Sequence, residues 1–445
     1  MKRNRLVLTV TSILLLCAVT FSFVGCAAQS EAETSKKTET QTETKEKAEV
    51  NKEPLSVTKK LSEGVVPNAV NANTLSPADN KKYTDFAVRL FKESEKSGEN
   101  TLISPLSVIY ALSMTANGAK GETLRQMEEV LGMSKDELNS YLFSYARALP
   151  QGDSYKLTLA NSVWFKDSGD FTVNEDFLQT NADYYGADIF KAPFSDETLR
   201  DINNWVNENT DGMIPEILDF IDPMAVMYLA NALAFEADWD EKYYEGSISE
   251  GTFTGEDGKT EVVEMMYGSE SSYLEDSNAT GFIKYFNGEK YAFAALLPDE
   301  GVSVSDYVAS LDGEKLYSIL ESKKEARVLT KLPKFETDFK VDMKDVLFSL
   351  GMKDAFDGAK ADFTNLGTYE PINIHISRVL HKTHIEVGPQ GAKAGAATAV
   401  EFLGMGGPTI LEPLKEVYLD RPFVYMLIDC ENNVPFFIGT VMSVE

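Results

Sequence analysis

Residues 381–400, HKTHIEVGPQGAKAGAATAV, are the stretch that decides the fold of this chain. If the second half is extended, every other side chain from Ala392 to Val400 lies on one face, and that face is small or apolar throughout. Lys393 and Glu401 then fall on the other face, where both charges stay in water. Alanine and glycine form weak strands, so the composition also fits an ordinary flexible loop. A loop that inserts between existing strands would need such small side chains, and both interpretations follow from the residues.

Two blocks in this stretch resemble the serpin family, and the resemblance favours insertion. HKTHIEV resembles the strand that leads into the serpin reactive loop. The next block resembles the hinge of that loop, and its residues are Gly391, Ala392, Lys393, Ala394, Gly395, Ala396, Ala397 and Thr398. Five further blocks resemble serpin motifs in the same order along the chain: residues 104–123, 228–239, 332–335, 350–356 and 420–429. From its sequence the chain is identified as a member of this family.

The resemblance implies an α+β serpin fold, with a large central β-sheet over a buried helix, further sheets, surrounding helices and an exposed reactive-centre loop. Patterns in the sequence favour the same class. Residues 108–116 are apolar nearly all round, which is typical of a buried helix. Residues 226–235 resemble a buried strand, and residues 282–297 and 422–441 are typical of hairpins.

The N-terminus predicts export and attachment to a membrane. Residues 1–25 combine a basic start with a short apolar run, as in a signal peptide. The sequence FVGC at residues 23–26 resembles a bacterial lipobox, so we expect cleavage before Cys26 and lipidation of its thiol. The expected location is the extracellular cell surface, as a membrane-anchored bacterial lipoprotein, and secretion without lipid is the alternative.

The rest of the chain divides into a tether and one domain. Residues 26–66 are rich in Ser, Thr, Lys, Glu and Gln and nearly free of large apolar side chains, which predicts disorder. A coil of roughly 40 residues spans about 35 Å, so it would hold a domain just clear of the surface. Residues 67–445 contain no second low-complexity stretch and no repeat, and the resemblance assigns them to one serpin domain.

Charge and cysteine content narrow the possible partners. The formal net charge is −28, and removing the three basic residues that precede Cys26 brings it to −31. Such an acidic chain argues against binding nucleic acid, polyanions or anionic lipid through a basic face. Contact with the membrane is therefore expected through the lipid only, and the protein is expected to be a monomer. Cys430 is the one cysteine in the predicted domain, which excludes an internal disulfide there.

The sequence offers no convincing enzymatic constellation. It contains no GxSxG, HExxH, GxxxxGK or CxxC motif. His381, His384 and Glu386 are of metal-ligating types, but residues three apart on a strand face opposite sides, so the two histidines cannot share an ion. Cys430 has no basic neighbour in the sequence that would activate its thiol. We therefore expect no enzymatic activity, no metal site and no cofactor.

The resemblance also implies a polar cluster beneath the central sheet, which is called the shutter. By motif match its members are Ser104, with Ser107 nearby, Asn231 and His381. A small hydrogen-bonded cluster of this kind can form in each of two arrangements of the sheet. The alternative is that these residues are satisfied core polar groups with no role in switching.

Trp239 matches the tryptophan of the serpin breach, which lies under the top of the same sheet where the loop inserts. This region departs from the family pattern. Glu236-Ala237 stand where serpins usually have Lys-Gly. The contacts that serpins make at the top of the sheet are therefore not predicted for this chain. Lys393 replaces the usual Glu on the solvent face, where the cost should be small. Pro389 replaces an acidic residue, and its missing N–H would weaken a ladder position if it lay within a strand.

The reactive bond is expected after the hinge. The usual serpin spacing places it between Met405 and Gly406. Phe402 and Leu403 are alternatives, because residues 406–421 are several residues longer than is common in serpins. These side chains suit a protease with an apolar primary pocket of the elastase, chymotrypsin or subtilisin type. Trypsin-like proteases should be poor targets.

The resemblance predicts an inhibitor of serine proteases, with some cysteine proteases as further targets. It would act by suicide cleavage of the reactive loop, loop insertion and covalent trapping of the acyl-enzyme. The alternative is a non-inhibitory serpin that acts as a binding module, although small hinge side chains argue against it. A loop that proteases cut without consequence also remains open.

Overall fold

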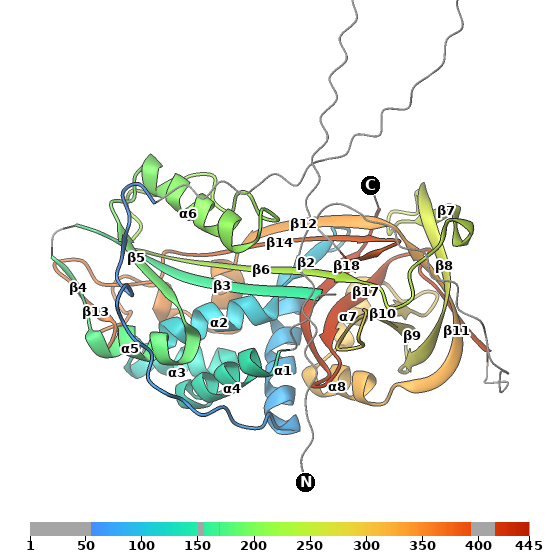
Figure 1. Ribbon diagram of the computed structural model, residues 1–445, viewed down its shortest axis with the longest axis horizontal. Coiled ribbons are helices and arrows are strands. Elements are labelled where there is room, and N and C mark those ends of the chain that lie inside the picture. Colours follow the sequence, from blue (N-terminus) through green and yellow to red (C-terminus); the bar gives the residue numbers. More distant parts are fainter. Residues whose placement is uncertain (1–54, 150–154, 169, 393–413, 445) are drawn as a thin grey trace, which may run out of the picture. The chain divides into compact units, whose positions relative to one another are not determined.

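The computed structural model describes residues 55–149, 155–168, 170–392 and 414–444. A seven-stranded sheet, sheet A, lies at its centre (Figure 1). Its order among these residues is β1-β5-β3-β6-β15-β14-β12. The strands are β1 (Lys59–Lys60), β3 (Tyr155–Lys166), β5 (Asp188–Ala192), β6 (Met227–Asp238), β12 (Phe335–Asp342), β14 (Arg378–Gly388) and β15 (Gly391–Ala392). The pairs β3–β5 and β6–β14 are parallel, whereas β3–β6 and β12–β14 are antiparallel. Parallel neighbours need long crossovers, which the helices between these strands provide.

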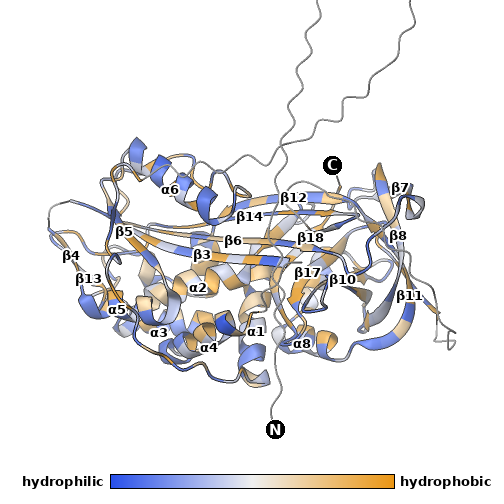
Figure 2. Cartoon of the chain, viewed as in Figure 1, coloured by the Kyte–Doolittle hydropathy of each residue, from blue (hydrophilic) through white to orange (hydrophobic). Residues whose placement is uncertain are grey.

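Helix α2 (Pro105–Ala116) packs beneath sheet A and is buried along its whole length. Ser104 caps it by accepting a hydrogen bond from the Ser107 N–H, and Pro105 occupies a first-turn position where no N–H is needed. Its mostly apolar surface appears in orange tones in Figure 2. The prediction of a buried helix at residues 108–116 is confirmed.

The other helices cover both faces of sheet A. Those on the side of α2 are α1 (Pro77–Ser94), α3 (Gly121–Leu131), α4 (Lys135–Ala148) and α5 (Glu175–Tyr185) (Figure 1). Helix α6 (Asp196–Asn209) covers part of the opposite, outer face, where Trp205 packs in one apolar cluster with Trp164, Phe190 and Tyr228. The shorter elements are α7 (Val304–Ser310), α8 (Gly313–Glu321), α9 (Lys344–Leu350), η1 (Glu245–Ser247) and η2 (Asp354–Phe356).

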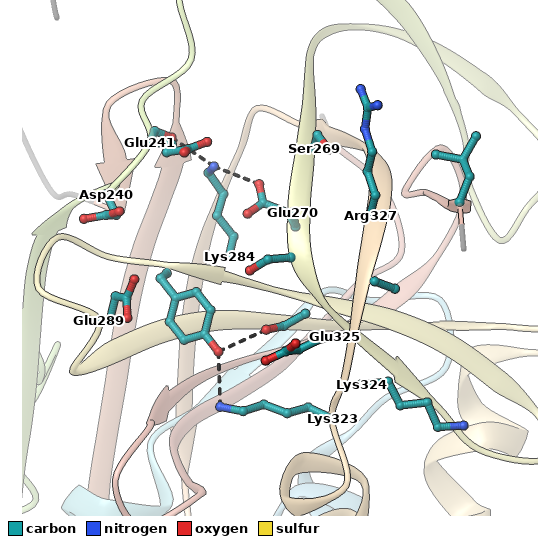
Figure 3. Close-up of a pocket in the computed structure, with 15 residues that line it drawn as sticks. Asp240, Glu241, Ser269, Glu270, Lys284, Glu289, Lys323, Lys324, Glu325 and Arg327 are labelled. Carbon is teal, nitrogen blue, oxygen red and sulfur yellow. Dashed lines mark hydrogen bonds and ion pairs between the residues drawn. The ribbon is translucent and has the colours of Figure 1, made fainter. Parts of the chain in front are cut away.

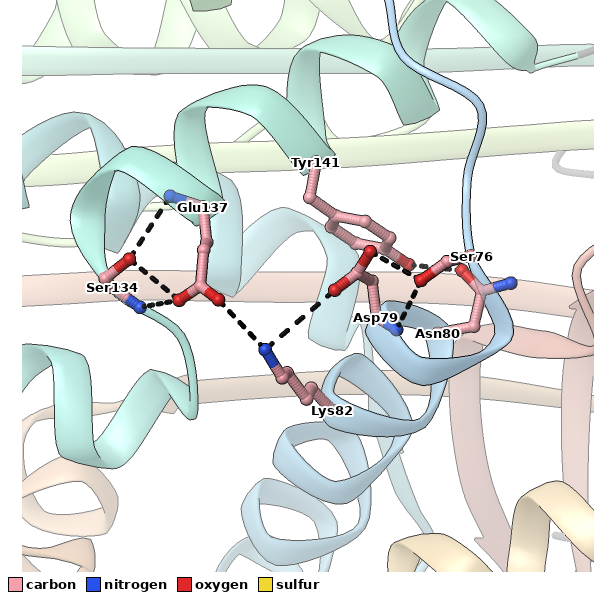
Figure 4. Close-up of polar contacts among 7 residues, drawn as sticks. All are labelled: Ser76, Asp79, Asn80, Lys82, Ser134, Glu137 and Tyr141. Atoms are coloured by element: carbon pink, nitrogen blue, oxygen red, sulfur yellow. Dashed lines mark hydrogen bonds and ion pairs between the residues drawn. The ribbon is translucent and has the colours of Figure 1, made fainter.

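Polar side chains fix the start of α1 against the start of α4 (Figure 4). Ser134 and Glu137 form a capping box at α4. Lys82 of α1 reaches Glu137 at 3.1 Å and Asp79 at 3.9 Å. The Tyr141 hydroxyl donates to the Asn80 side chain at 3.1 Å. These contacts join the starts of two helices that lie on the α2 side of sheet A.

The second large sheet contains the predicted hairpins. Its main path among the described residues is β16-β11-β8-β9-β10-β17-β18-β2, with β7 beside β8. Gly288, in the turn of the β9–β10 hairpin, has a φ of +83°, which explains the glycine there. The strands are β2 (Thr101–Ile103), β7 (Ile248–Thr254), β8 (Thr260–Glu275), β9 (Ala279–Tyr285), β10 (Tyr291–Pro298), β11 (Lys324–Pro333), β16 (Leu414–Tyr418), β17 (Phe423–Asp429) and β18 (Val434–Val441). A separate pair consists of β4 (Phe171–Val173) and β13 (Gly367–Tyr369).

The structure differs from the sequence-based boundary of the tether at residue 66. Strand β1 pairs with β5 at the edge of sheet A. Just before it, the Ser56 N–H and the Thr58 hydroxyl donate to the Asp201 carboxylate at 2.8 and 2.6 Å. Residues 55–66 are therefore attached to the domain, because backbone pairing and Asp201 hold a segment whose composition is polar. Within the described ranges, none of the helices combines the length and apolar character needed to cross a bilayer.

Candidate functional site

The first residues of the predicted hinge lie inside sheet A. Ala392 of β15 pairs with Ala237 on β6 and with Val387 on β14. A Cβ atom built on Gly391 would lie 2.0 Å from the Ala237 carbonyl oxygen. Because that distance is far inside van der Waals contact, only glycine fits at this position between the two strands.

Below β15, the central strands separate over several residues. Among the described residues, β6 and β14 pair directly only at residues 228–231 and 378–381. Residues 232–236 of β6 and 382–386 of β14 therefore have no backbone pairing with each other. The stretch ends in β15 at one end and in the Asn231–His381 pair at the other.

The predicted shutter residues form one hydrogen-bonded cluster beneath that end. The Ser104 N–H donates to His381 Nε2 at 3.1 Å, and the Ser107 hydroxyl donates to Asn231 Oδ1 at 3.1 Å. His381 Nδ1 lies 3.3 Å from the same Asn231 oxygen. All four residues are buried. Helix α2 and two strands of sheet A are thus joined where those strands would have to part.

The charge state of His381 follows from this geometry. Because Nε2 accepts a hydrogen bond, the proton of the neutral ring belongs on Nδ1, which can then donate to Asn231. Burial lowers the pKa of His381 to about 3. The ring is therefore neutral at physiological pH, and the cluster contains no formal charge.

Asn161 is a member of this row that sequence reasoning missed. It lies on β3 directly opposite Asn231, so Asn161, Asn231 and His381 occupy one line across three strands. Its Oδ1 and the Asn231 Nδ2 are buried without a partner among the described residues. The sequence does show an asparagine in a predicted strand at this position. Only the register between β3 and β6 shows that its side chain faces the cluster.

The predicted breach residue Trp239 holds the turn that precedes the hinge. Its indole N–H donates to the Gly388 carbonyl and its backbone N–H to the Gln390 carbonyl, both at 2.8 Å. The Tyr243 N–H donates to the Pro389 carbonyl at 3.0 Å. Pro389 lies between β14 and β15, so its missing N–H removes no ladder bond from sheet A.

A buried ion pair lies beside Trp239 in a cavity of about 950 Å³ (Figure 3). Lys284 donates to Glu270 at 2.9 Å and to the Glu241 carbonyl at 3.0 Å. Its ammonium lies 4.4 Å from the ring centre of Tyr243 and 5.3 Å from that of Trp239. Burial raises the pKa of Glu270, and Lys284 offsets only part of this effect. Lys284, which lines this cavity, therefore contacts both residues that hold the turn at 388–390.

His384, a residue of metal-ligating type, and Cys430, the one thiol of the domain, are not members of the shutter cluster. His384 faces away from His381, as the strand alternation predicts, and contacts Asp338 on β12. Burial raises the pKa of the Cys430 thiol to about 12, so it is protonated at neutral pH and a weak nucleophile. The predicted residues that lie outside the described part of the chain are Cys26, Lys393, Ala394, Gly395, Ala396, Ala397, Thr398, Phe402, Leu403, Met405 and Gly406.

Comparison with known proteins agrees with this geometry. The family model described as serpin (serine protease inhibitor) matches residues 81–444. The native-state crystal structure of the thermophilic serpin tengpin is 46% identical and gives a TM-score of 0.83 over 87% of this chain and 100% of that one. Tengpin in the latent state is 44% identical and gives 0.75 over 84% and 100%. Leukocyte elastase inhibitor A of Mus musculus is 29% identical over 81% of this chain and 98% of its own. The chain belongs to the serpin family.

Proposed function

We propose that this chain inhibits serine proteases by suicide trapping, with some cysteine proteases as further targets. The protease would cleave at Met405–Gly406 and form an acyl-enzyme, after which residues 392–405 would insert between β6 and β14. About 13 steps at about 3.3 Å each would carry the ester roughly 43 Å. Distortion of the trapped protease would disturb its oxyanion hole, and deacylation would slow. The chain itself would act as an inhibitor and not as an enzyme.

The observation that carries this proposal is the position of β15. Its two residues already pair with both neighbours, and the unpaired stretches of β6 and β14 begin directly below them. Extending the observed register places Ala394, Ala396 and Thr398 on the side of α2. Their partners on β14 would then be Ile385, Thr383 and His381, which are all buried. The small side chains of the hinge suit this inner face.

On the outer face of the inserted strand, Lys393 and Glu236, two residues that depart from the serpin pattern, would lie side by side. The same register places Lys393 between Glu236 on β6 and Glu386 on β14. Serpins usually carry the opposite charges at the positions of Lys393 and Glu236. The two substitutions would therefore compensate each other, and Lys393 would stabilise the inserted state.

Target and location are further parts of the proposal. Met405, with Phe402 and Leu403 nearby, suits a protease with an apolar primary pocket, and a mouse relative is named as an inhibitor of leukocyte elastase. The signal-like residues 1–25 and Cys26 favour a lipid-anchored protein at a bacterial surface, with secretion as the alternative. A non-inhibitory serpin that acts as a binding module is the rival function.

A pair of neighbouring substitutions tests the insertion step. Ala396→Glu would bury an unpaired carboxylate at a cost of several kcal/mol, so the loop should be cleaved without trapping the protease. Ala397→Glu is the matched control, because the same register places position 397 on the outer face beside Lys382. We expect the stoichiometry of inhibition to rise strongly for the first variant only. Equal inhibition by both variants would show that the loop does not insert in this register.

A further inference from the structure

The outer face of β12 and β14 brings together an imidazole and several carboxylates. Asp338 on β12 lies opposite His384 on β14, and Glu336 lies opposite Glu386 one row further along. Positions two apart on a strand share a face, so these four side chains project from the same side of sheet A. This face is opposite to the shutter, because His381 points toward α2.

We propose that Glu336, Asp338 and His384 bind a divalent transition-metal ion of the Zn²⁺ type. Each residue offers one ligand atom, and these atoms all lie within 4.8 Å of one another. His384 Nδ1 is 3.0 Å from Asp338 Oδ1 and 3.9 Å from Glu336 Oε1. Two ligands of a tetrahedral Zn²⁺ ion lie about 3.4 Å apart, which these two distances bracket.

The donor set selects the class of ion. One imidazole with two carboxylates suits zinc and similar transition metals, whereas Mg²⁺ and Ca²⁺ prefer oxygen ligands alone. A water molecule would complete four-coordination. The His384 side chain is 16% exposed, whereas those of Glu336 and Asp338 are 62% and 63% exposed, so a largely buried ring lies beside two carboxylates that face solvent.

The surrounding charges leave this site acidic. Among the residues that the structure describes, no lysine or arginine pairs with Glu336 or Asp338. The nearest row contains Lys340 and Lys382, but both lysines are engaged elsewhere. Lys340 pairs with Asp219 at 2.5 Å, and Lys382 donates to a backbone carbonyl at 3.0 Å. A cation bound by Glu336 and Asp338 would therefore meet two carboxylates that no lysine or arginine of the described residues neutralises.

Sequence reasoning predicted no metal because it compared His384 only with its neighbours along β14. The carboxylates come from β12, 46 to 48 positions earlier in the chain, and only the register of the two strands brings them to His384. A bound ion would bridge β12 and β14. It would stabilise the folded state by mass action, since the unfolded chain lacks the site.

Calorimetric titration of the full chain with ZnCl₂ at neutral pH tests this site. We expect a single site in the wild type, weaker binding of Mg²⁺, and an affinity loss of at least about tenfold in His384→Ala and in the near-isosteric Asp338→Asn. His375→Ala is the matched control, because His375 is a partly exposed histidine outside this cluster. Circular dichroism should show that all variants are folded.

Three outcomes would overturn the assignment. No saturable Zn²⁺ binding in the wild type would mean that His384 and Asp338 only contact each other and bind no ion. Unchanged Zn²⁺ affinity in both His384→Ala and Asp338→Asn would place the ion elsewhere on the chain. Loss of binding in His375→Ala alone would lead to the same conclusion.

Discussion

Acid should weaken the folded state through His381, and the size of the effect follows from its burial. In the unfolded chain this imidazole would titrate near its ordinary pKa of 6.5, whereas burial lowers its pKa in the fold to about 3. Between these values the unfolded chain binds a proton that the folded chain does not. The stabilising contribution is therefore complete above about pH 6.5 and is lost as the pH falls toward 3.

A pH of about 4.5 lies two units below the pKa of the His381 imidazole in the unfolded chain. At about 1.4 kcal/mol per unit, His381 should cost the fold about 3 kcal/mol there relative to neutral pH. His381→Gln removes the titrating group, while its amide oxygen can still accept from the Ser104 N–H. The variant should be less stable at neutral pH, where the cluster is imperfect, but it should lose much less stability on acidification.

Urea unfolding followed by tryptophan fluorescence, at neutral pH and at about pH 4.5, measures this difference. Other buried groups add to the pH dependence, such as Glu270 and Asp429, whose pKa values burial raises. They are present in both proteins and cancel in the comparison. His375→Gln, at a partly exposed histidine outside the shutter, should behave like the wild type. If wild type and His381→Gln lose the same free energy of unfolding in acid, the described burial of the shutter histidine is wrong.

Further substitutions test the hinge, the reactive bond and the anchor. Gly391→Ala should displace β15 and lower the free energy of unfolding by about 1–3 kcal/mol, because the added Cβ would meet a backbone oxygen of β6. An unchanged urea midpoint would argue against this packing. Lys393→Glu should slow insertion by placing a third carboxylate between two glutamates, and stopped-flow kinetics that match the wild type would refute the register. Met405→Arg should redirect inhibition to trypsin-like proteases; inhibition without this shift would mean that another bond is attacked. Cys26→Ser should move the protein from the detergent phase to the aqueous phase, and a wild type that is already aqueous would favour simple secretion.

Much of the fold could be predicted because local sequence signals agree with tertiary packing. The apolar residues of α2, its Ser-Pro start and the Asn-Gly turn of the β9–β10 hairpin each predict their element without reference to the rest of the chain. Ser104, Asn231 and His381 were placed by their motifs, and the structure brings them within hydrogen-bond distance.

The features that sequence reasoning missed all depend on register between distant strands. Asn161 joins the shutter row through the β3–β6 ladder, and Asp338 reaches His384 through the β12–β14 ladder. The attachment of residues 55–66 depends on Asp201, a partner more than a hundred positions away. Composition alone cannot reveal such contacts, because a polar segment can be held in place by a single carboxylate and one edge strand.

Incubation with an elastase-like serine protease, followed by denaturing electrophoresis and sequencing of the released fragment, tests the central claim most directly. The proposed mechanism predicts an SDS-resistant complex whose mass is the sum of the protease and the cleaved chain, and a released C-terminal fragment that begins at Gly406. Complete cleavage of the chain with full recovery of protease activity, and no such complex, would contradict it.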